Sequence, residues 1–210
     1  METDLGGQFK SVFSRLRMQG FLLLSDPKLP SVCSLIAGQA LKTSWWSHPM
    51  AQAIFKVNGK LEDHPDVLVT KLISGKVTFV HRKLWAHILV IGSARESWQM
   101  KHLSAEAGKL LKTLDKRGCL RSDKMDWPKS AATKPAAAVS ELEKKLLINA
   151  EQIHTETGAH AKQLESWAYW AKRREFKSEV SSVATAKQDI EDRLSEMIEE
   201  FGATAQLPWT

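Results

Sequence analysis

The residue types best suited to acid–base chemistry gather in one short segment, Asp63-His64-Pro65-Asp66. An imidazole between two carboxylates can act as a general base or position a water molecule. His48 is an imidazole on an earlier segment and is a further candidate. The competing interpretation is that the two aspartates hydrogen-bond the backbone of a turn. His48, Asp63, His64 and Asp66 are therefore the candidates for catalysis, and we expect no metal site and no cofactor.

Aromatic residues are densest in a second segment, Trp45-Trp46-Ser47-His48-Pro49, and tryptophan supplies 8 of the 16 Phe, Trp and Tyr residues in the chain. Adjacent tryptophans cannot easily both face the same core. One of them is then available as an exposed stacking surface or a wedge against nucleotides. The alternative is that both rings pack between domains, because Trp buries a large apolar area.

Basic side chains offer possible contacts to a phosphate backbone. Ser74-Gly75-Lys76 lacks the Gly-x-x-x-x-Gly-Lys spacing of a P-loop, which argues against nucleotide hydrolysis. The segment suits a basic turn that touches phosphates, or a plain solvated turn. The residues that we predict to contact nucleic acid are Lys71, Lys76, Arg82, Arg121, Lys124, Lys144, His160 and Lys162, together with Trp45 and Trp46.

A helix-turn-helix pattern at 103–123 is the main element available to position such contacts. Ser104 is a good N-cap, because its hydroxyl can accept a hydrogen bond from a backbone N–H of the first helical turn. Gly118 stands where a left-handed residue ends a helix. One face between them is apolar at helical spacing, through Ala107, Leu110, Leu111 and Leu114. The pattern predicts a helix between Ser104 and Gly118.

Two further helices are expected after it. A tether at 119–120 follows the first helix. Ser122 or Asp123 can then cap a second helix, which Pro128 limits to little more than one turn. Apolar residues at helical spacing predict a third helix over 136–147. Two helices and a third after a turn are the arrangement of a DNA-reading unit.

The segment from 142 to 171 has two interpretations. Ile153, Thr155 and Thr157 are β-branched, and Gly158 suits a turn, which together favour a hairpin that forms a wing. Apolar residues also recur at near-heptad spacing through the same segment, which is typical of one long amphipathic helix. Gly158 would cost that helix about 1 kcal/mol relative to Ala.

The residues before the helix-turn-helix pattern combine helices with a β-hairpin. The hairpin is predicted from alternating apolar residues at 67–73 and 77–80, joined through Ser74-Gly75. Apolar spacing also predicts helices over 9–20, 32–41, 47–59 and 186–201 and a short strand at 21–24. The expected fold class is α+β, mainly helical. Its parts are an N-terminal helical subdomain with a β-hairpin (1–102), a winged-helix-like unit (103–175), and a C-terminal helix with a tail (176–210).

Three stretches of the chain resemble the bacterial AlkZ-related family, whose members are related to the winged-helix DNA glycosylase AlkZ. They are GFLLLSDPKLPSVCSLIAG at 20–38, TKLISGKVTFVHRKLW at 70–85 and LSAEAGKLLKTLDKRGCLRSD at 103–123. The resemblance implies winged-helix units and, for the glycosylase itself, a catalytic Gln-x-Gln motif. The glutamines here stand at 8, 19, 39, 52, 99, 152, 163, 188 and 206, and no two are separated by a single residue. The resemblance therefore implies a fold and a nucleic-acid partner, without that catalytic pair.

Charge is distributed unevenly along the chain. Residues 1–135 contain 21 Lys and Arg against 11 Asp and Glu, whereas residues 136–210 contain 9 against 13. The basic portion suits a nucleic-acid face, although scattered lysines on solvated helices give similar counts. Cys33 and Cys119 lack partners at ligand spacing, so we expect reduced thiols. The apolar segment at 84–92 is too short to span a membrane, and we expect a cytoplasmic protein without a membrane partner.

The predicted function is nucleic-acid binding, with DNA as the expected partner, by a winged-helix protein linked to DNA repair. The first alternative is a protein-interaction module that forms a homodimer or a complex with a partner protein and does not bind DNA. The second alternative is a glycosylase-like enzyme, with a pocket walled by the tryptophan pair and a water molecule positioned by the Asp-His-Pro-Asp segment. The missing Gln-x-Gln pair argues against the enzyme.

Overall fold

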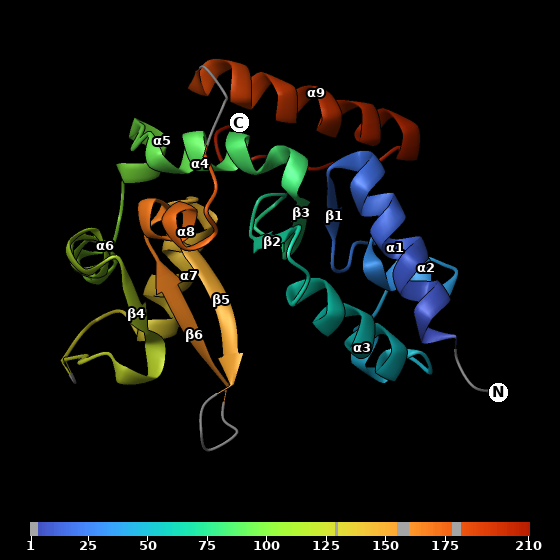
Figure 1. Cartoon of the computed structure of the whole chain (residues 1–210), viewed down its shortest axis with the longest axis horizontal. Helices are drawn as coiled ribbons and strands as arrows, with labels where there is room; N and C mark the ends of the chain where they lie inside the picture. Colours follow the sequence, from blue (N-terminus) through green and yellow to red (C-terminus); the bar gives the residue numbers. More distant parts are fainter. Residues whose placement is uncertain (1–3, 129, 155–159, 178–181) are drawn as a thin grey trace. The chain divides into compact units, whose positions relative to one another are not determined.

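The computed structural model describes residues 4–128, 130–154, 160–177 and 182–210 (Figure 1). The fold is α+β and mainly helical, as predicted. The chain forms two compact units. The first contains residues 1–85 and 187–207, and the second contains residues 86–186 and 208–210. The three-part division based on sequence pattern stays a prediction.

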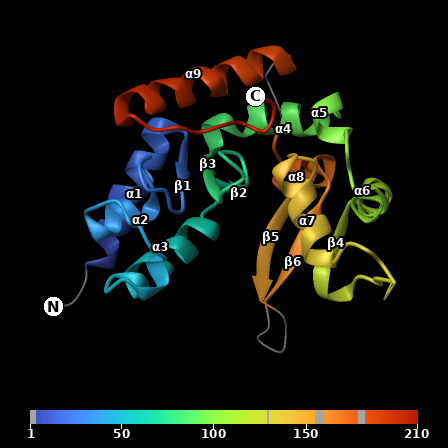
Figure 2. The ribbon, with the colours of Figure 1, turned by 180° about the vertical axis from the view of Figure 1, so that it is seen from behind.

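The first unit is a three-stranded antiparallel sheet with its helices. Strand β3 is central, because it pairs with both other strands in the order β1-β3-β2. Figure 2 shows these elements from behind, in blue to teal. In chain order they are α1 (Leu5–Gln19), β1 (Phe21–Leu23), α2 (Val32–Ala37), the 3-10 turn η1 (Trp45–Ser47), α3 (Ala51–Glu62), β2 (Val67–Thr70), β3 (Thr78–His81) and the 3-10 turn η2 (Arg82–Leu84).

Local signals explain where helix α1 begins and ends. The Asp4 carboxylate accepts a hydrogen bond of 2.9 Å from the backbone N–H of Gly7, which caps the first turn. Val12 and Leu16 are buried and face the core. Gly20 then adopts a φ of 93° and donates its N–H to the Leu16 carbonyl at 2.8 Å. This left-handed residue ends the helix, and the chain enters β1 directly.

Helix α2 is shorter than its predicted range of 32–41, and α3 is shifted from its predicted range of 47–59. Helix α2 ends at Ala37, because Gly38 has a φ of 73° and leaves the helical conformation. Helix α3 begins at Ala51, since the chain first makes the separate turn η1. Pro49 therefore lies in the turn before α3 and not in its first helical turn.

The β-hairpin predicted at 67–80 is confirmed, with shorter strands. Ser74 and Gly75 form its turn with φ values of 50° and 66°, and the Lys76 N–H donates to the Ile73 carbonyl at 2.9 Å. The Ser74 N–H donates to the carbonyl of Gln206, at 2.7 Å, instead of to the facing strand. Because the Ser74 N–H bonds to Gln206, the β2–β3 ladder does not continue as far as the turn.

The second unit also contains a three-stranded antiparallel sheet, in the order β4-β6-β5. Helix α4 (Trp85–Ser93) starts at the last residue of the first unit's leading segment, and α9 (Val183–Phe201) begins in the second unit and continues into the first. The helix predicted over 186–201 is thus confirmed. The other elements are α5 (Ser97–Met100), α6 (Ala105–Arg117), β4 (Cys119–Arg121), the 3-10 turn η3 (Ser122–Lys124), α7 (Pro135–Lys144), β5 (Asn149–His154), β6 (His160–Glu165) and α8 (Trp167–Arg173).

The predicted helix after Ser104 is confirmed as α6. The Ser104 hydroxyl accepts a hydrogen bond of 3.2 Å from the Ala107 N–H, and Gly118 has a φ of 80° after the last turn. The predicted tether at 119–120 belongs instead to strand β4, because it pairs with β6. The predicted second helix is only the 3-10 turn η3.

The hairpin interpretation of residues 142–171 is confirmed, and the interpretation as one long helix is wrong. Strands β5 and β6 pair from Asn149 opposite Glu165 to His154 opposite His160. Helix α7 ends at Lys144, and Leu146 has a φ of 52°, which directs the chain away from a helical path. The predicted turn residues Thr155, Thr157 and Gly158 lie outside the described residues.

The two units have the same order of elements, which the sequence did not reveal. Each contains a helix, a strand, a short helix or turn, a longer helix and a hairpin, with the third strand in the centre of the sheet. Gly20 and Gly118, both with positive φ, join the first helix directly to the first strand. Their carbonyls each accept a hydrogen bond of 2.8 Å, from the N–H of His81 and of Ser166. The backbone therefore follows the same path in the two units where the first helix meets the first strand and where the central strand ends.

A tryptophan marks equivalent places in the two cores. Trp85 lies four residues after His81, and Trp170 lies four residues after Ser166. Both indoles are fully buried, at 1% and 0% exposure. Each unit therefore closes its core with a large ring that follows the central strand.

The two cysteines are free thiols. Cys33 is buried in α2, and burial raises its pKa to about 11. Cys119 is half-buried in β4. Within the ranges that the structure describes, no helix has the length and apolar character needed to cross a bilayer.

Candidate nucleic-acid interface

Helix α3 has two sharply different faces. Its buried positions, at helical spacing, are Ala53, Ile54, Val57 and Leu61. On the opposite face Gln52, Phe55 and Lys56 are exposed, and 54% of Phe55 is accessible to solvent. Large aromatic side chains are normally turned toward a core. We call Gln52, Phe55 and Lys56 the outer face of α3.

The tryptophan pair divides its two rings between core and solvent. Trp45 is half-buried and packs against the core of the first unit, whereas 63% of Trp46 is exposed. The two rings are stacked, with centroids 3.8 Å apart and planes 25° apart. Phe55 lies beside them, because its ring centroid is 6.0 Å from that of Trp46. The result is an aromatic surface that extends from η1 onto the outer face of α3.

The candidate catalytic residues lie at the two ends of α3. His48 precedes the helix, and its Nδ1 accepts the Met50 N–H at 3.1 Å. Asp63 follows the helix as its C-cap. Twelve helical residues separate them, a length of about 18 Å. The structure therefore does not bring His48 together with the other candidates.

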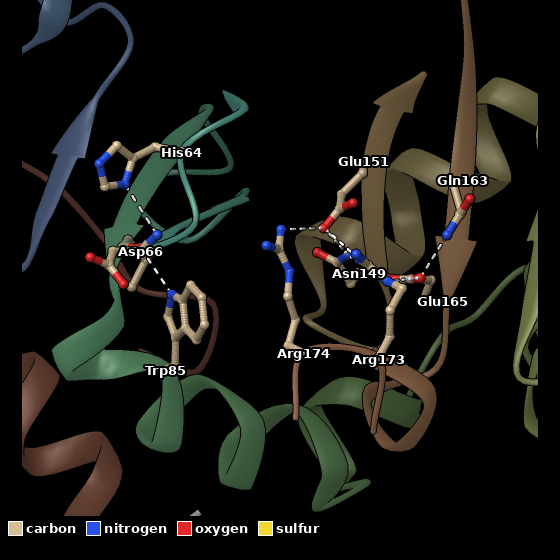
Figure 3. A network of polar contacts seen from close by, with 10 residues as sticks. His64, Asp66, Trp85, Asn149, Glu151, Gln163, Glu165, Arg173 and Arg174 are labelled. Carbon is tan, nitrogen blue, oxygen red and sulfur yellow. Dashed lines mark hydrogen bonds and ion pairs between the residues drawn. The ribbon is translucent and has the colours of Figure 1, made fainter. Parts of the chain in front are cut away.

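His64 and Asp66 have local structural partners. The His64 Nδ1 accepts the Asp66 N–H at 3.1 Å, as Figure 3 shows. The His64 ring packs against Phe13 with centroids 4.2 Å apart. Asp66 faces the guanidinium of Arg82 at 3.7 Å. The side chain that accepts a backbone N–H in this turn is therefore His64, and not one of the two aspartates of the turn-capping interpretation.

The predicted phosphate-binding residues of the first unit are partly committed to other groups. Lys76 forms an ion pair of 2.7 Å with Asp26. Burial opposes ionisation of Asp26, but hydrogen bonds from Lys76 and from two backbone N–H groups outweigh it and lower the pKa. Arg82 also lies over the Trp85 ring, 5.4 Å from its centroid, and Lys71 is half-buried. By contrast, Lys56 and Lys42 are exposed.

Helix α7 presents a plainer face than α3. Its exposed residues Ala136, Ala137 and Lys144 include only one charged side chain. Glu141 and Glu143, two carboxylates that would repel phosphate if they faced outward, have internal partners. Glu141 accepts hydrogen bonds from the Ser104 N–H at 2.9 Å and the Ser104 hydroxyl at 2.7 Å. Glu143 is buried and pairs with Lys162 at 2.7 Å.

The remaining predicted contacts of the second unit are dispersed. The Lys162 ammonium is held by Glu143, and Arg121 is paired with Asp123 at 2.9 Å. Lys124 is exposed in η3. His160 begins β6, and its side chain lies outside the described part of the structure. The structure therefore joins Trp45 and Trp46 into one surface but leaves the predicted cations distributed over several elements.

A buried carboxylate is the centre of the polar network in Figure 3. Glu165, with 0% exposure, accepts two hydrogen bonds from Arg173, at 2.6 and 2.7 Å. Asn149 and Gln163 donate to it at 3.1 and 2.8 Å. Glu165 raises the pKa of the Arg173 guanidinium further above its usual range. Because its oxygens are occupied by four donors, Glu165 serves to join α8 to the β5–β6 hairpin.

The outer face of α3 was missed in the sequence. Phe55 in an apolar-rich helix reads as one more core residue. Its position is nevertheless out of phase with the buried stripe of Ala53, Ile54, Val57 and Leu61, and that mismatch is a usable signal. Lys56 follows Phe55 directly and was not among the predicted contacts. Both residues belong with Trp46.

Each unit therefore has the same order of helices and strands, and the first unit exposes an aromatic and basic face on α3. The AlkZ-related family model matches residues 7–206. The chain therefore belongs to the AlkZ-related family, which indicates a protein related to DNA repair. No curated protein and no solved structure matches the chain.

Proposed function

We propose that the chain binds DNA, with the outer face of α3 and Trp46 as its principal contact surface. The observation that carries the proposal is the composition of this surface. Phe55 and Trp46 are more than half exposed, and Gln52 and Lys56 lie beside Phe55 on the helix. Residues 27–61 contain no Asp or Glu. The carboxylate of α3 is at its last residue, Glu62, so aromatic, amide and ammonium groups dominate around Phe55 and suit a polyanion with aromatic bases.

The position of α3 in the fold supports the same function. In a helix-turn-helix protein the second long helix lies in the major groove, while the first crosses behind it. By element order, α3 would correspond to this second helix in the first unit, and α7 would correspond to it in the second. The proposal treats both units as winged helices, with the β2–β3 and β5–β6 hairpins as their wings. Membership of the AlkZ-related family agrees with this assignment.

Phosphate contacts should supply the sequence-independent part of the affinity. Lys42 and Lys56 are exposed, and in the sequence they lie close to Trp46 and Phe55. Further basic side chains lie at the β2–β3 hairpin, namely Lys71, Lys76 and Arg82. Lys76 contributes less than its exposure suggests, because DNA would compete with Asp26 for the same ammonium.

The second unit is proposed to add weaker contacts. Lys124 and Lys144 are exposed, and Arg121 and Lys162 are paired with carboxylates. The exposed alanines of α7 offer no hydrogen-bonding group to a base edge. Binding by this unit should therefore depend on backbone contacts and little on sequence.

The proposal is a binding function without an assigned reaction. A glycosylase needs groups that converge on the sugar of a flipped nucleotide. His48 and Asp63 are separated by the length of α3, and His64 and Asp66 have partners in their own turn. Nothing in this arrangement favours base release over binding.

Fluorescence anisotropy of the full chain with a labelled duplex, at about 50 and 200 mM salt, tests the proposal. We expect binding that weakens steeply with salt. Lys56→Ala should weaken duplex binding and reduce the salt slope by about 1. Lys10→Ala, which removes an exposed lysine of α1, is the matched control and should leave both unchanged. No binding at low salt, or equal effects of the two variants, would contradict the proposal.

The interaction-module alternative predicts different results in the same experiments. Under that alternative the aromatic surface is covered by a second copy or by a partner protein. Analytical ultracentrifugation would then show a stable dimer that Trp46→Ala dissociates, and the anisotropy titration would show no DNA affinity. The absence of carboxylates from 27–61 argues against self-association through this surface, because two copies would bring like charges together.

A further inference from the structure

The exposure of Trp46 and Phe55 is more than duplex binding requires. The major groove presents hydrogen-bonding base edges and a polar phosphate backbone, and apart from the thymine methyl group it offers little apolar surface to a ring. The face of an unpaired base is different, because it is flat, apolar and able to stack on an aromatic side chain. Rings that are 63% and 54% exposed therefore match an unpaired base better than an intact groove.

The geometry of the three rings is suited to stacking. Trp45 is anchored against the core of the first unit, and Trp46 stacks on it with a centroid separation of 3.8 Å. This contact holds Trp46 in place before any ligand arrives, so little side-chain entropy is lost on binding. Phe55 is fixed by its place on α3 and lies 6.0 Å from Trp46 at an angle of 43°. One side of Trp46 is thus occupied by Trp45, and the exposed side is available to continue the stack.

The charged side chains near Trp46 and Phe55 favour a nucleic-acid ligand over a protein. Lys56 is adjacent to Phe55, and Lys42 is exposed four residues before Trp46. Between η1 and the end of α3 the one carboxylate is Glu62, the last residue of the helix and two turns after Phe55. A protein partner would need an acidic and apolar surface, whereas a nucleic-acid strand supplies flat rings and phosphates at a regular spacing.

We infer that Trp46 and Phe55 form a stacking site for unpaired nucleotides, so that the chain prefers DNA containing single-stranded or extrahelical bases over intact duplex. The inference rests on the proposed DNA-binding function and specifies its ligand. In this arrangement the bases stack on the rings, while Lys42 and Lys56 contact the adjoining phosphates.

The test compares three fluorescein-labelled DNAs of the same sequence, each about 12 nucleotides long: a single strand, a duplex and a duplex with a central bulge. Anisotropy titrations with the full chain should show tighter binding of the single strand and the bulged duplex than of the intact duplex. Trp46→Ala and Phe55→Ala should each weaken binding of the first two by about tenfold and weaken duplex binding much less.

Conservative variants separate stacking from apolar contact. Trp46→Phe and Phe55→Tyr keep a ring and should retain the preference, whereas Phe55→Leu keeps apolar area without a ring and should lose it. Met18→Ala removes another exposed apolar side chain, on α1, and should have no effect. Circular dichroism of each variant checks that it is folded.

The outcomes distinguish this inference from the proposed function. No binding of any of the three DNAs would overturn both. Salt-dependent binding with equal affinity for all three, or equal losses on all three in Trp46→Ala, would overturn the stacking site and leave the DNA-binding function intact. A dimer that Trp46→Ala dissociates, with no preference among the DNAs, would assign the surface to self-association and would also overturn the inference.

Discussion

The two units share a backbone arrangement but differ in the chemistry of equivalent positions. In the first unit Val80 of the central strand lies opposite Leu68, and both are buried, at 0% and 2% exposure. In the second unit the corresponding pair is Glu165 and Asn149, which are buried equally, at 0% and 1%. The same strand arrangement therefore accepts either an apolar pair or a polar pair in which Asn149 donates to a carboxylate that Arg173 also binds.

Helices α3 and α7, which precede the hairpins of the two units, differ in the side chains that they expose to solvent. Helix α3 turns Phe55 and Lys56 to solvent, whereas α7 turns mainly alanines outward and directs Glu143 inward to Lys162. The first unit exposes aromatic and basic side chains on α3. The second unit combines an apolar core with the buried polar network of Glu165, and the outward face of α7 is plain. Under the proposed function, recognition of DNA belongs to the first unit and a supporting role to the second.

The largest effect in this comparison should come from the buried ion pair. Arg173→Ala leaves the Glu165 carboxylate buried without its main partner, and should lower the free energy of unfolding by about 4 kcal/mol. Urea denaturation followed by circular dichroism measures this change. Arg121→Ala, which breaks the more exposed pair with Asp123, is the control and should cost much less. Equal costs would remove the distinction between a polar core and a polar surface in this unit.

The shared backbone path can be tested at its glycines. Gly118→Ala would force a side chain into a φ of 80° and place its Cβ 2.6 Å from the Tyr169 ring, so we expect a loss of about 3 kcal/mol. Gly20→Ala should cost somewhat less, because the atoms that it meets belong to the flexible side chains of Leu84 and Lys83. Gly38→Ala has the same backbone problem, with a φ of 73°, but open space around it. It should cost only about 1 kcal/mol. Thermal denaturation of the three variants should follow this order, and a different order would break the proposed equivalence.

The surface ion pair of the first unit should have a smaller, pH-dependent effect. The lowered pKa of Asp26 means that its contribution to stability is present above the usual carboxyl value of about 4 and is lost as the pH falls through the folded-state value. Asp26→Asn should therefore destabilise the protein by about 1 kcal/mol at neutral pH, and the difference should shrink as the pH falls below the usual carboxyl value of about 4. Unfolding curves of both proteins at neutral pH and across the acidic range measure it. A difference that persists in acid would show that the pair is not its cause.

Much of the second unit could be predicted because its signals are local. Ser104 and Gly118 mark the ends of α6 by their side-chain chemistry and backbone freedom, and both were placed correctly. The partners of Glu141 and Glu143 could not be predicted, because Ser104 and Lys162 are far from them in the sequence and are brought near only by the fold. Their positions in the sequence alone do not show that these two carboxylates have partners inside the unit.

The equivalence of the two units was hidden for a related reason. A repeat is visible in a sequence only when equivalent positions keep similar residues, and Val80 and Leu68 have nothing in common with Glu165 and Asn149. The candidate site shows the same limit. The tryptophan pair was recognised from its composition, but its assembly with Phe55 depends on the turn η1 and on the start of α3 at Ala51.

Amide hydrogen exchange of the full chain, with and without the bulged duplex, is the most direct test of the assignment of recognition to the first unit. We predict that DNA slows exchange in peptides covering 42–60, which contain η1 and the outer face of α3, and that it changes 136–144 of α7 much less. Protection concentrated in 136–144, with 42–60 unchanged under conditions where the DNA is bound, would contradict the account.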